Sequence, residues 1–342
     1  MILSLKGIRF AYPDGFEALR KVDAEIEEKA FVVVLGESGS GKTTLLKVIA
    51  GLLDPQEGEV FLNGSEATSL ETKSRDLSMV FQNNVLYPHL TIYHNVLLGL
   101  NGFGLSEEEM DERTKTILSA FGLRNYLNYK PKHLSEGQRQ RVCICKALIR
   151  EPSLLLLDEP LSNLDEPQRA RIRKELKAIF EERDTSFLYV SHDLKDASMA
   201  TEIWIMDKGR IVQRGTAKGI REMPHSLLAF RLITAGEINE YKVRVESGRA
   251  LGGAFSLESD KPEGDYVLAF TYKDAFLDPK GPIEGEVYSC KLTNSGILLN
   301  IKLKDDSLLG CYVDEESEIK NGDVLRFDID RKAIRLFDLK AN

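Results

Sequence analysis

The segment 31–51 constrains the fold of this chain most, because a strand pattern, a glycine-rich turn and a helix pattern follow one another directly. Residues 31–35 are apolar, mostly β-branched and uncharged, as in a strand buried on both faces. In the turn 36–44, two glycines separated by four residues precede Lys42 and Thr43. Such a turn directs backbone N–H groups into one concavity at a helix N-terminus. The segment predicts an oligophosphate site, whereas an unliganded flexible loop would not need this strand–helix context.

Two side chains of this turn are expected to carry charge and metal chemistry. Lys42 would neutralise β- and γ-phosphates, and the Thr43 hydroxyl would bind Mg²⁺. The residues predicted to hold the phosphates are Gly36, Glu37, Ser38, Gly39, Ser40, Gly41, Lys42, Thr43 and Thr44.

Length and charge limit the remaining possibilities. A chain of 342 residues suggests two domains, and its net charge of −8 argues against a broad basic surface for nucleic acid, although not against a local basic patch. The first residues lack a signal-peptide layout, and no apolar run reaches the roughly 18 residues that cross a bilayer. We expect a cytosolic protein whose membrane role, if any, comes through a partner. Cys143 and Cys145 are expected to be buried structural thiols rather than metal ligands.

Residues 1–235 are predicted to form an α/β domain. Antiparallel strands are expected at 2–5, 8–12 and 22–26, ahead of the turn. Further on, apolar strand patterns alternate with helical ones, which predicts a parallel sheet with ligands beyond the carboxyl ends of its strands. The expected strands are 31–35, 78–81, 153–157, 186–190 and 203–206, and the expected helices are 107–121 with Ser106 as N-cap, 134–149 and 167–183.

The pattern changes near residues 222–240. Downstream, apolar residues alternate at 288–292, 297–303 and 325–329, with Gly, Pro, Asn and Asp in the intervening turns. We therefore predict a second domain, 236–342, folded as a small all-β barrel.

A second apolar strand ends in two carboxylates, Asp158 and Glu159. Asp158 is placed to hold Mg²⁺, and Glu159 to polarise an attacking water. Adjacent acidic residues before a proline could instead cap the next helix, and the upstream phosphate-binding turn favours the first interpretation.

With these motifs in order, residues 1–220 resemble the ATP-binding-cassette (ABC) ATPases. The segment 134–138, Leu-Ser-Glu-Gly-Gln, matches the family signature, except that Glu136 stands where Gly is commonest. Tyr12 matches the aromatic residue that stacks on adenine, although on composition alone it would be ordinary packing. Gln82 matches the glutamine that joins the Mg²⁺ site and senses the permease. Residues 162–165 match the D-loop, and His192 matches the switch histidine at the γ-phosphate.

The resemblance also implies how the site works. In the family, two chains pair head to tail, and each ATP lies between the phosphate loop of one chain and the signature of the other. A homodimer is therefore expected, with Ser135, Gly137 and Gln138 contacting the ATP of the partner. A carboxylate at Glu136 could weaken phosphate affinity or slow turnover.

The segment from 236 resembles the OB-like TOBE domain of bacterial importer ATPases, and 84–93 resembles their permease-docking surface. This implies an ATPase at the cytoplasmic face of the membrane, bound to permease subunits, indirectly served by a solute-binding protein, and without nucleic acid. A carbohydrate or glycerol-phosphate-like solute is favoured, and iron, polyamine and oxyanion importers are the alternatives. A soluble ABC ATPase of DNA repair or translation is a remote alternative, because neither the coiled-coil insertion nor the second cassette of those proteins is present. The second domain could also bind a regulator.

Overall fold

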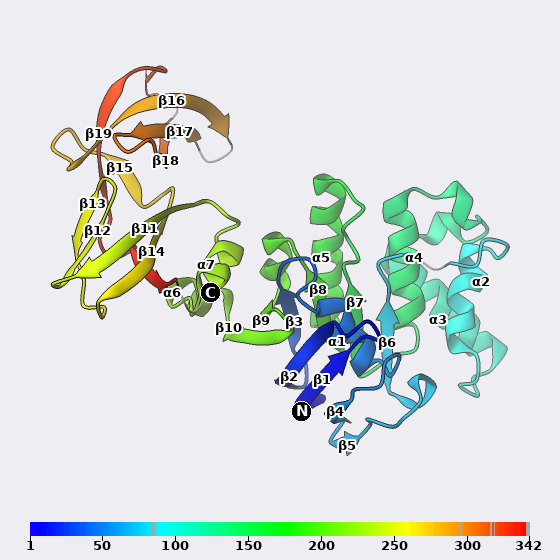
Figure 1. Cartoon of the computed structure of the whole chain (residues 1–342). Helices are drawn as coiled ribbons and strands as arrows, with labels where there is room; N and C mark the ends of the chain where they lie inside the picture. The colour runs from blue at the N-terminus through cyan, green and yellow to red at the C-terminus, as the bar shows by residue number, and fades with distance from the viewer. Residues whose placement is uncertain (84–85, 294–295, 315–316, 318, 340–342) are drawn as a thin grey trace. The chain divides into compact units, whose positions relative to one another are not determined.

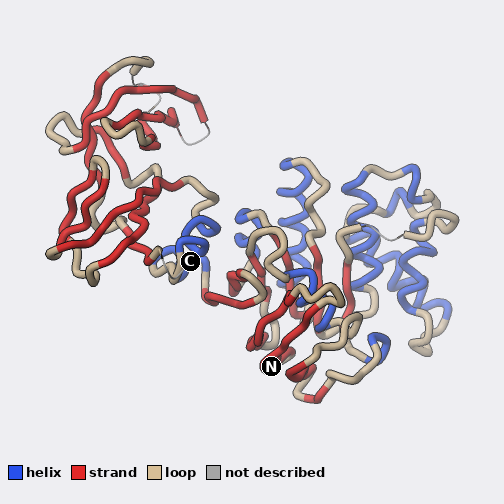
Figure 2. The backbone as a smooth tube through the Cα atoms, viewed as in Figure 1, coloured by secondary structure: helices blue, strands red, loops and turns tan. Residues whose placement is uncertain are grey.

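The computed structural model describes residues 1–83, 86–293, 296–314, 317 and 319–339, and all elements named below lie within these ranges. The chain separates into two compact units, Met1–Gly219 and Ile220–Asn342. Figure 1 labels the elements, and Figure 2 shows that the first unit combines helices with strands whereas the second is mostly strand.

The first unit is built on a six-stranded sheet in the order β10-β9-β3-β8-β7-β6. Strands β9, β3, β8, β7 and β6 are parallel, and β10 is antiparallel to β9. Every residue of β3, β7 and β8 is buried, which explains why these strands are apolar apart from residues at their ends, Asp158, Ser186 and Ser191. The prediction of an α/β domain is confirmed. The strand bounds are β3 (Phe31–Leu35), β6 (Leu77–Val80), β7 (Leu154–Asp158), β8 (Ser186–Ser191), β9 (Glu202–Asp207) and β10 (Arg210–Gly215).

The first unit also contains a smaller antiparallel sheet, with its strands in the order β2-β1-β4-β5. The sequence predicted two strands at 2–5 and 8–12, and this was wrong, because the structure has the single strand β1. Gly7 lies inside it at φ 61°, and the pairing with β2 shifts register between Leu5 and Ile8. The glycine therefore forms a bulge rather than a turn. The bounds are β1 (Leu3–Ala11), β2 (Glu17–Ile26), β4 (Glu57–Leu62) and β5 (Ser65–Glu66).

The helices of the first unit include a group, α2, α3 and α4, whose members contact one another beside the sheet (Figure 1). Ser106 caps α3, as predicted, by accepting a hydrogen bond from Glu109 N. Among the described residues, no helix is both long and apolar enough to span a bilayer. The bounds are α1 (Lys42–Ile49), α2 (Ile92–Leu97), α3 (Glu107–Ala120), α4 (Glu136–Leu148) and α5 (Glu166–Glu182), with 3-10 turns η1 (Thr72–Ser74), η2 (Leu98–Leu100), η3 (Arg124–Tyr126), η4 (Pro131–His133) and η5 (Leu194–Met199).

The two neighbouring cysteines of α4 are buried, as predicted. Cys145 is wholly enclosed, and its Sγ lies 3.8 Å from the carbonyl oxygen of Ile117 in α3. Burial raises the pKa of the Cys143 thiol to about 12. Both thiols are therefore protonated packing groups at neutral pH.

The second unit contains two five-stranded antiparallel sheets, in the orders β13-β12-β11-β14-β20 and β15-β19-β16-β17-β18. This confirms a β-rich domain. In the second sheet the terminal strands approach each other, because Cys311 Sγ of β18 donates to Ala275 O of β15 over 3.0 Å. The bounds are β11 (Ile238–Glu246), β12 (Arg249–Gly252), β13 (Phe255–Glu258), β14 (Gly264–Thr271), β15 (Ala275–Leu277), β16 (Ile283–Thr293), β17 (Gly296–Leu303), β18 (Leu308–Val313), β19 (Val324–Ile329) and β20 (Arg335–Asp338).

The second unit begins before its first strand. Helix α6 (Ala217–Glu222) crosses the division between the units, and α7 (Leu227–Ile233) belongs to the second. Leu227 and Phe230 of α7 pack with Val267 and Phe337 of the first of these sheets in one apolar cluster. The expected boundary at 235/236 would separate this helix from the sheet that covers its apolar face.

Candidate functional site

The predicted phosphate loop connects β3 to α1, and steric crowding dictates two of its glycines. A Cβ at Gly36 would lie 2.4 Å from Met206 O, and a Cβ at Gly41 would lie 2.4 Å from Ala18 O. Gly39 differs, because it has φ +81° and a Cβ there would have no atom beyond its chain neighbours within 4 Å. The loop is thus packed against the sheet on one side and open beside Gly39, which leaves room for a ligand at the N-terminus of α1.

Two polar side chains of this loop differ in their hydrogen bonding: Lys42 bonds to the loop backbone, and Ser40 has no partner among the described residues. Lys42 Nζ donates to Gly36 O and Glu37 O over 2.8 and 2.9 Å. Burial lowers the pKa of Lys42, partly opposed by the nearby carboxylates Glu159 and Asp158. Ser40 Oγ is buried and has no hydrogen-bond partner among the described residues. An anion in the open part of the loop would relieve both costs.

The two predicted protein ligands of Mg²⁺ lie together. Thr43 Oγ1, in the first turn of α1, donates to Asp158 Oδ1 at the end of β7 over 2.8 Å. Burial raises the pKa of Asp158, and the hydrogen bond from Thr43 opposes this effect. A hydroxyl and a carboxylate oxygen are the hard ligands that Mg²⁺ prefers, so the donor set fits this ion.

Glu159 and His192 lie side by side at the ends of neighbouring strands. His192 Nδ1 is 3.3 Å from Glu159 Oε2, and the Glu159 side chain is 19% exposed. Glu159 adopts φ 43°, in the left-handed region that a glutamate rarely occupies. Its N–H donates to Val190 O of β8 over 3.1 Å, and its carbonyl accepts from Ser162 N, so strand β8 and the turn after Glu159 hold the conformation.

Tyr12 lies beside the phosphate loop, whereas Gln82 is exposed after the end of β6. Tyr12 OH lies 3.0 Å from Thr44 Oγ1, and its ring meets Phe10 edge-on. The half-buried ring therefore stands next to the phosphate loop. Gln82 is exposed just beyond β6, whose parallel neighbour β7 ends at Asp158. Adenine stacking and Mg²⁺ binding by these residues remain predictions. In the expected docking surface 84–93, residues 84 and 85 lie outside the described part of the chain.

The signature segment forms the N-terminus of α4. Ser135 Oγ accepts from Gln138 N over 3.3 Å, and Gln138 Oε1 accepts from Ser135 N over 2.9 Å, which makes a capping box. A Cβ at Gly137 would lie 2.6 Å from Gln168 Oε1 of α5, so a larger residue would displace the end of the Gln168 side chain. Glu136 forms an ion pair with Arg139 in the same turn. Within this one chain, the side chains of Ser135 and Gln138 each accept a hydrogen bond from the backbone N–H of the other residue.

Sequence reasoning missed a buried polar group behind His192. Arg173 of α5 donates from Nε to Asp196 Oδ1 of η5 over 2.7 Å, and Ser191 Oγ donates to Asp196 Oδ2 over 2.6 Å. Burial alone would lower the pKa of Arg173, but hydrogen bonds with Glu166 and Asp196 outweigh it and raise that pKa. The only sequence signal is an arginine on the inner face of a helix, which does not identify its acidic partner.

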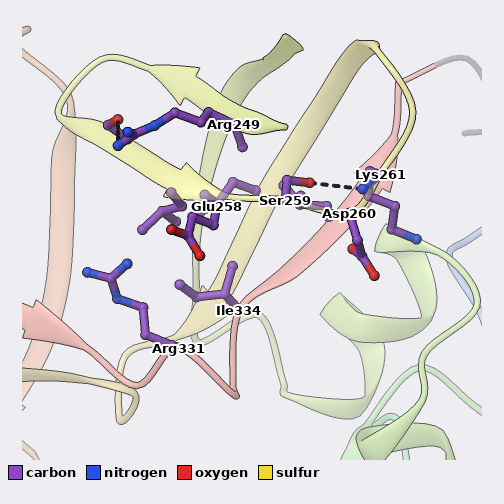
Figure 3. Close-up of a pocket in the computed structure, with 12 residues that line it drawn as sticks. Arg249, Glu258, Ser259, Asp260, Lys261, Arg331 and Ile334 are labelled. Atoms are coloured by element: carbon purple, nitrogen blue, oxygen red, sulfur yellow. Dashed lines mark hydrogen bonds between the residues drawn. The ribbon is translucent and has the colours of Figure 1, made fainter. Parts of the chain in front are cut away.

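A separate cavity of about 620 Å³ lies in the second unit. Arg249, Lys261 and Arg331 line it together with Glu258 and Asp260, and Figure 3 shows the ends of Arg331 and Lys261 on opposite sides. It contains no residue that the sequence analysis singled out. Because exposed charges of both signs line it, its chemistry does not select one ligand class.

Comparison with known proteins agrees with the geometry. The ABC transporter family matches residues 19–162, which include the phosphate loop, the signature and the Asp158–Glu159 pair. Over 98% of its length, the chain is 34% identical to the sn-glycerol-3-phosphate import ATP-binding protein UgpC of Psychromonas ingrahamii, of which 93% is covered. This chain belongs to the ABC transporter ATP-binding proteins. It is accordingly an ATPase with an ATP-binding site.

Other ABC relatives lead to the same family. The oligosaccharides import ATP-binding protein MsmX of Bacillus subtilis is 30% identical, over 98% of this chain and 97% of MsmX. Among solved structures, a dimeric, post-hydrolysis ABC cassette, MJ0796, bound to ADP and Pi is 32% identical with a TM-score of 0.58. That likeness covers 63% of this chain and 98% of the cassette. The cassette part of the chain therefore has the ABC fold.

Proposed function

We propose that this chain is the ATP-hydrolysing subunit of a bacterial importer for a carbohydrate or a glycerol-phosphate-like solute. The observation that carries the proposal is the similarity to UgpC and MsmX, which extends over 98% of the chain and so includes the β-rich second unit. Both relatives are named as import ATP-binding proteins, one for sn-glycerol-3-phosphate and one for oligosaccharides. Importers of iron, polyamines or oxyanions remain the alternatives.

In the proposed site, the loop 36–44 holds the phosphates of ATP, and Tyr12 stacks on the adenine. Thr43 and Asp158 hold Mg²⁺, with Gln82 completing the metal site from the end of β6. A metal ion bound there supplies positive charge against the β- and γ-phosphates. The open loop at Gly39 and the unpartnered Ser40 hydroxyl support this assignment.

We assign hydrolysis to Glu159 and His192. Glu159 polarises the attacking water, and His192 contacts the γ-phosphate from its position beside the glutamate. Their separation of 3.3 Å supports this pairing. Ser135, Gly137 and Gln138 act in the site of a second copy, so that two identical chains enclose two ATP molecules. The dimeric state of the MJ0796 cassette supports this arrangement.

The proposed partners are a second copy of the chain and transmembrane permease subunits, at the cytoplasmic face of the cell membrane. A solute-binding protein acts through the permease, without touching this subunit. No nucleic acid takes part. The proposal thus differs from the remote alternative of a soluble ABC ATPase of repair or translation.

The role of Glu159 is tested by Glu159→Gln. Loss of the carboxylate removes the base but keeps the size of the side chain, so we expect ATP hydrolysis to fall by about 10³-fold. ATP affinity should stay within about threefold, and the protein should form an ATP-dependent dimer in size-exclusion chromatography with light scattering. Turnover near that of the unchanged protein would remove Glu159 from this role.

The transport role is tested by affinity capture. Tagged Glu159→Gln protein is isolated from detergent-solubilised native membranes with ATP present, and copurifying proteins are identified by mass spectrometry. Lys42→Ala, which should not bind ATP, is the matched control for contacts that require the closed dimer. Permease subunits in the Glu159→Gln sample support the proposal, and their identity narrows the solute class. A dimer without permease, or one bound to ribosomes or repair proteins, would contradict it.

A further inference from the structure

A buried carboxylate lies directly behind the turn that carries His192. Asp196 is 3% exposed, and its neighbours Ser191 and Arg173 are 4% and 8% exposed. A carboxylate in such a place is costly unless several donors surround it. Asp196 belongs neither to the phosphate loop nor to the proposed Mg²⁺ ligands, so its burial serves another purpose.

Three side chains donate to the two oxygens of Asp196. Ser191 Oγ and Tyr189 OH donate to Oδ2 over 2.6 and 3.1 Å, and Arg173 Nε donates to Oδ1 over 2.7 Å. The carboxylate is thus fully engaged, and a satisfied buried cluster of this kind fixes the geometry of the groups around it.

Ser191 links Asp196 to the turn that contains His192. The Ser191 hydroxyl that donates to Asp196 also accepts from Asp193 N over 2.9 Å. The residues immediately before and after His192 are therefore tied to each other through one hydroxyl, whose orientation Asp196 sets. His192 itself remains free to face Glu159.

The same cluster reaches the loop that follows Glu159. Arg173 Nη2 donates to Asp193 Oδ2 over 3.2 Å, and Arg169 Nη1 contacts the same oxygen over 3.4 Å. Arg169 Nη2 also donates to Ser162 O over 2.8 Å. Helix α5 thus connects the segment after Glu159 to the segment around His192, with Asp196 and Asp193 as the acidic partners.

We infer that Asp196 is a positioning residue for ATP hydrolysis, holding through Ser191 the turn in which His192 lies against Glu159. The inference rests on the proposed roles of Glu159 and His192. In this assignment Asp196, which is 3% exposed, acts through the position of His192.

Two single-atom deletions on the same carboxylate oxygen test the inference in the full-length chain. Ser191→Ala and Tyr189→Phe each remove one hydroxyl bonded to Asp196 Oδ2, but only the Ser191 hydroxyl also holds Asp193 N. We expect Ser191→Ala to lower kcat by about tenfold, with KM for ATP and ATP affinity within about twofold. Tyr189→Phe should leave kcat within about twofold. Equal effects of the two variants would overturn the inference.

The carboxylate itself is tested by Asp196→Asn, with Asp196→Glu as the conservative variant. We expect Asp196→Asn to lower kcat by about 10- to 100-fold without a matching loss of ATP affinity, and Asp196→Glu to restore part of it. Combined with His192→Ala, Asp196→Asn should cost less than about threefold more, because the residue through which it acts is gone. A full multiplicative loss in the double variant would indicate a general structural effect and overturn the inference.

The single variant His192→Ala separates this inference from the proposed site. If His192→Ala lowers kcat but Ser191→Ala and Asp196→Asn do not, the positioning role fails and the site stands. If His192→Ala leaves kcat unchanged, the assignment of His192 fails, and the role of Asp196 fails with it.

Discussion

At the scale of the residue, the ionised carboxylate of Asp158 lowers the free energy of unfolding, because it is buried. Burial raises the pKa of Asp158 above its ordinary value. The folded chain therefore holds the proton of this carboxyl more tightly than the unfolded chain does. The stability that the protonated form contributes is complete below the unfolded pKa and is lost as pH rises through the raised folded pKa. At neutral pH, the buried charge is a cost that metal binding can offset.

The substitution Asp158→Asn should accordingly raise the thermal midpoint of the nucleotide-free protein at pH 7, while lowering Mg²⁺-dependent hydrolysis by at least about 100-fold. Asparagine can still accept the hydrogen bond from Thr43, so the packing is retained. Thermal unfolding between pH 4 and pH 8 checks this, since the gain in midpoint should grow with pH. A midpoint that falls at pH 7 would show that the ionised carboxylate stabilises the fold.

At the scale of the element, helices α3 and α4 both begin with a capping box. Ser106 with Glu109, and Ser135 with Gln138, each form a capping box. Because only α4 carries the signature, Ser106→Ala and Ser135→Ala should each cost about 1 kcal/mol of unfolding free energy, but only Ser135→Ala should reduce hydrolysis, by tenfold or more. Chemical denaturation and steady-state kinetics measure the two effects. Equal kinetic losses would mean that capping alone explains the signature serine.

At the scale of the whole molecule, the described residues contain separate apolar clusters. One contains residues of β1, β3 and α1 together with Trp204, and another lies in the second unit and contains Phe270 and Phe327. Two calorimetric unfolding transitions are therefore expected for Glu159→Gln. ATP with Mg²⁺ at about 100 times its Kd should stabilise the cassette transition by about 2.7 kcal/mol and leave the other in place. A single transition, or an equal shift of both, would contradict independent unfolding.

The sequence by itself determined those features that rest on short spacings along the chain. The strand, turn and helix around Lys42, the cap at Ser106, and the buried runs of β7 and β8 follow from local hydrogen bonding and apolar periodicity. A bulge and a turn look alike at this level, which is why the pattern around Gly7 predicts two strands where the fold has one.

The tertiary structure alone decided which distant side chains meet. Parallel pairing of β7 with β8 brings Glu159 to His192, and packing of α5 on η5 brings Arg173 to Asp196. The pKa changes of Lys42 and Asp158 also arise only from enclosure within the folded chain. Such contacts and desolvation depend on non-local packing, because residues far apart in the sequence carry no local signal of the partner that they will touch.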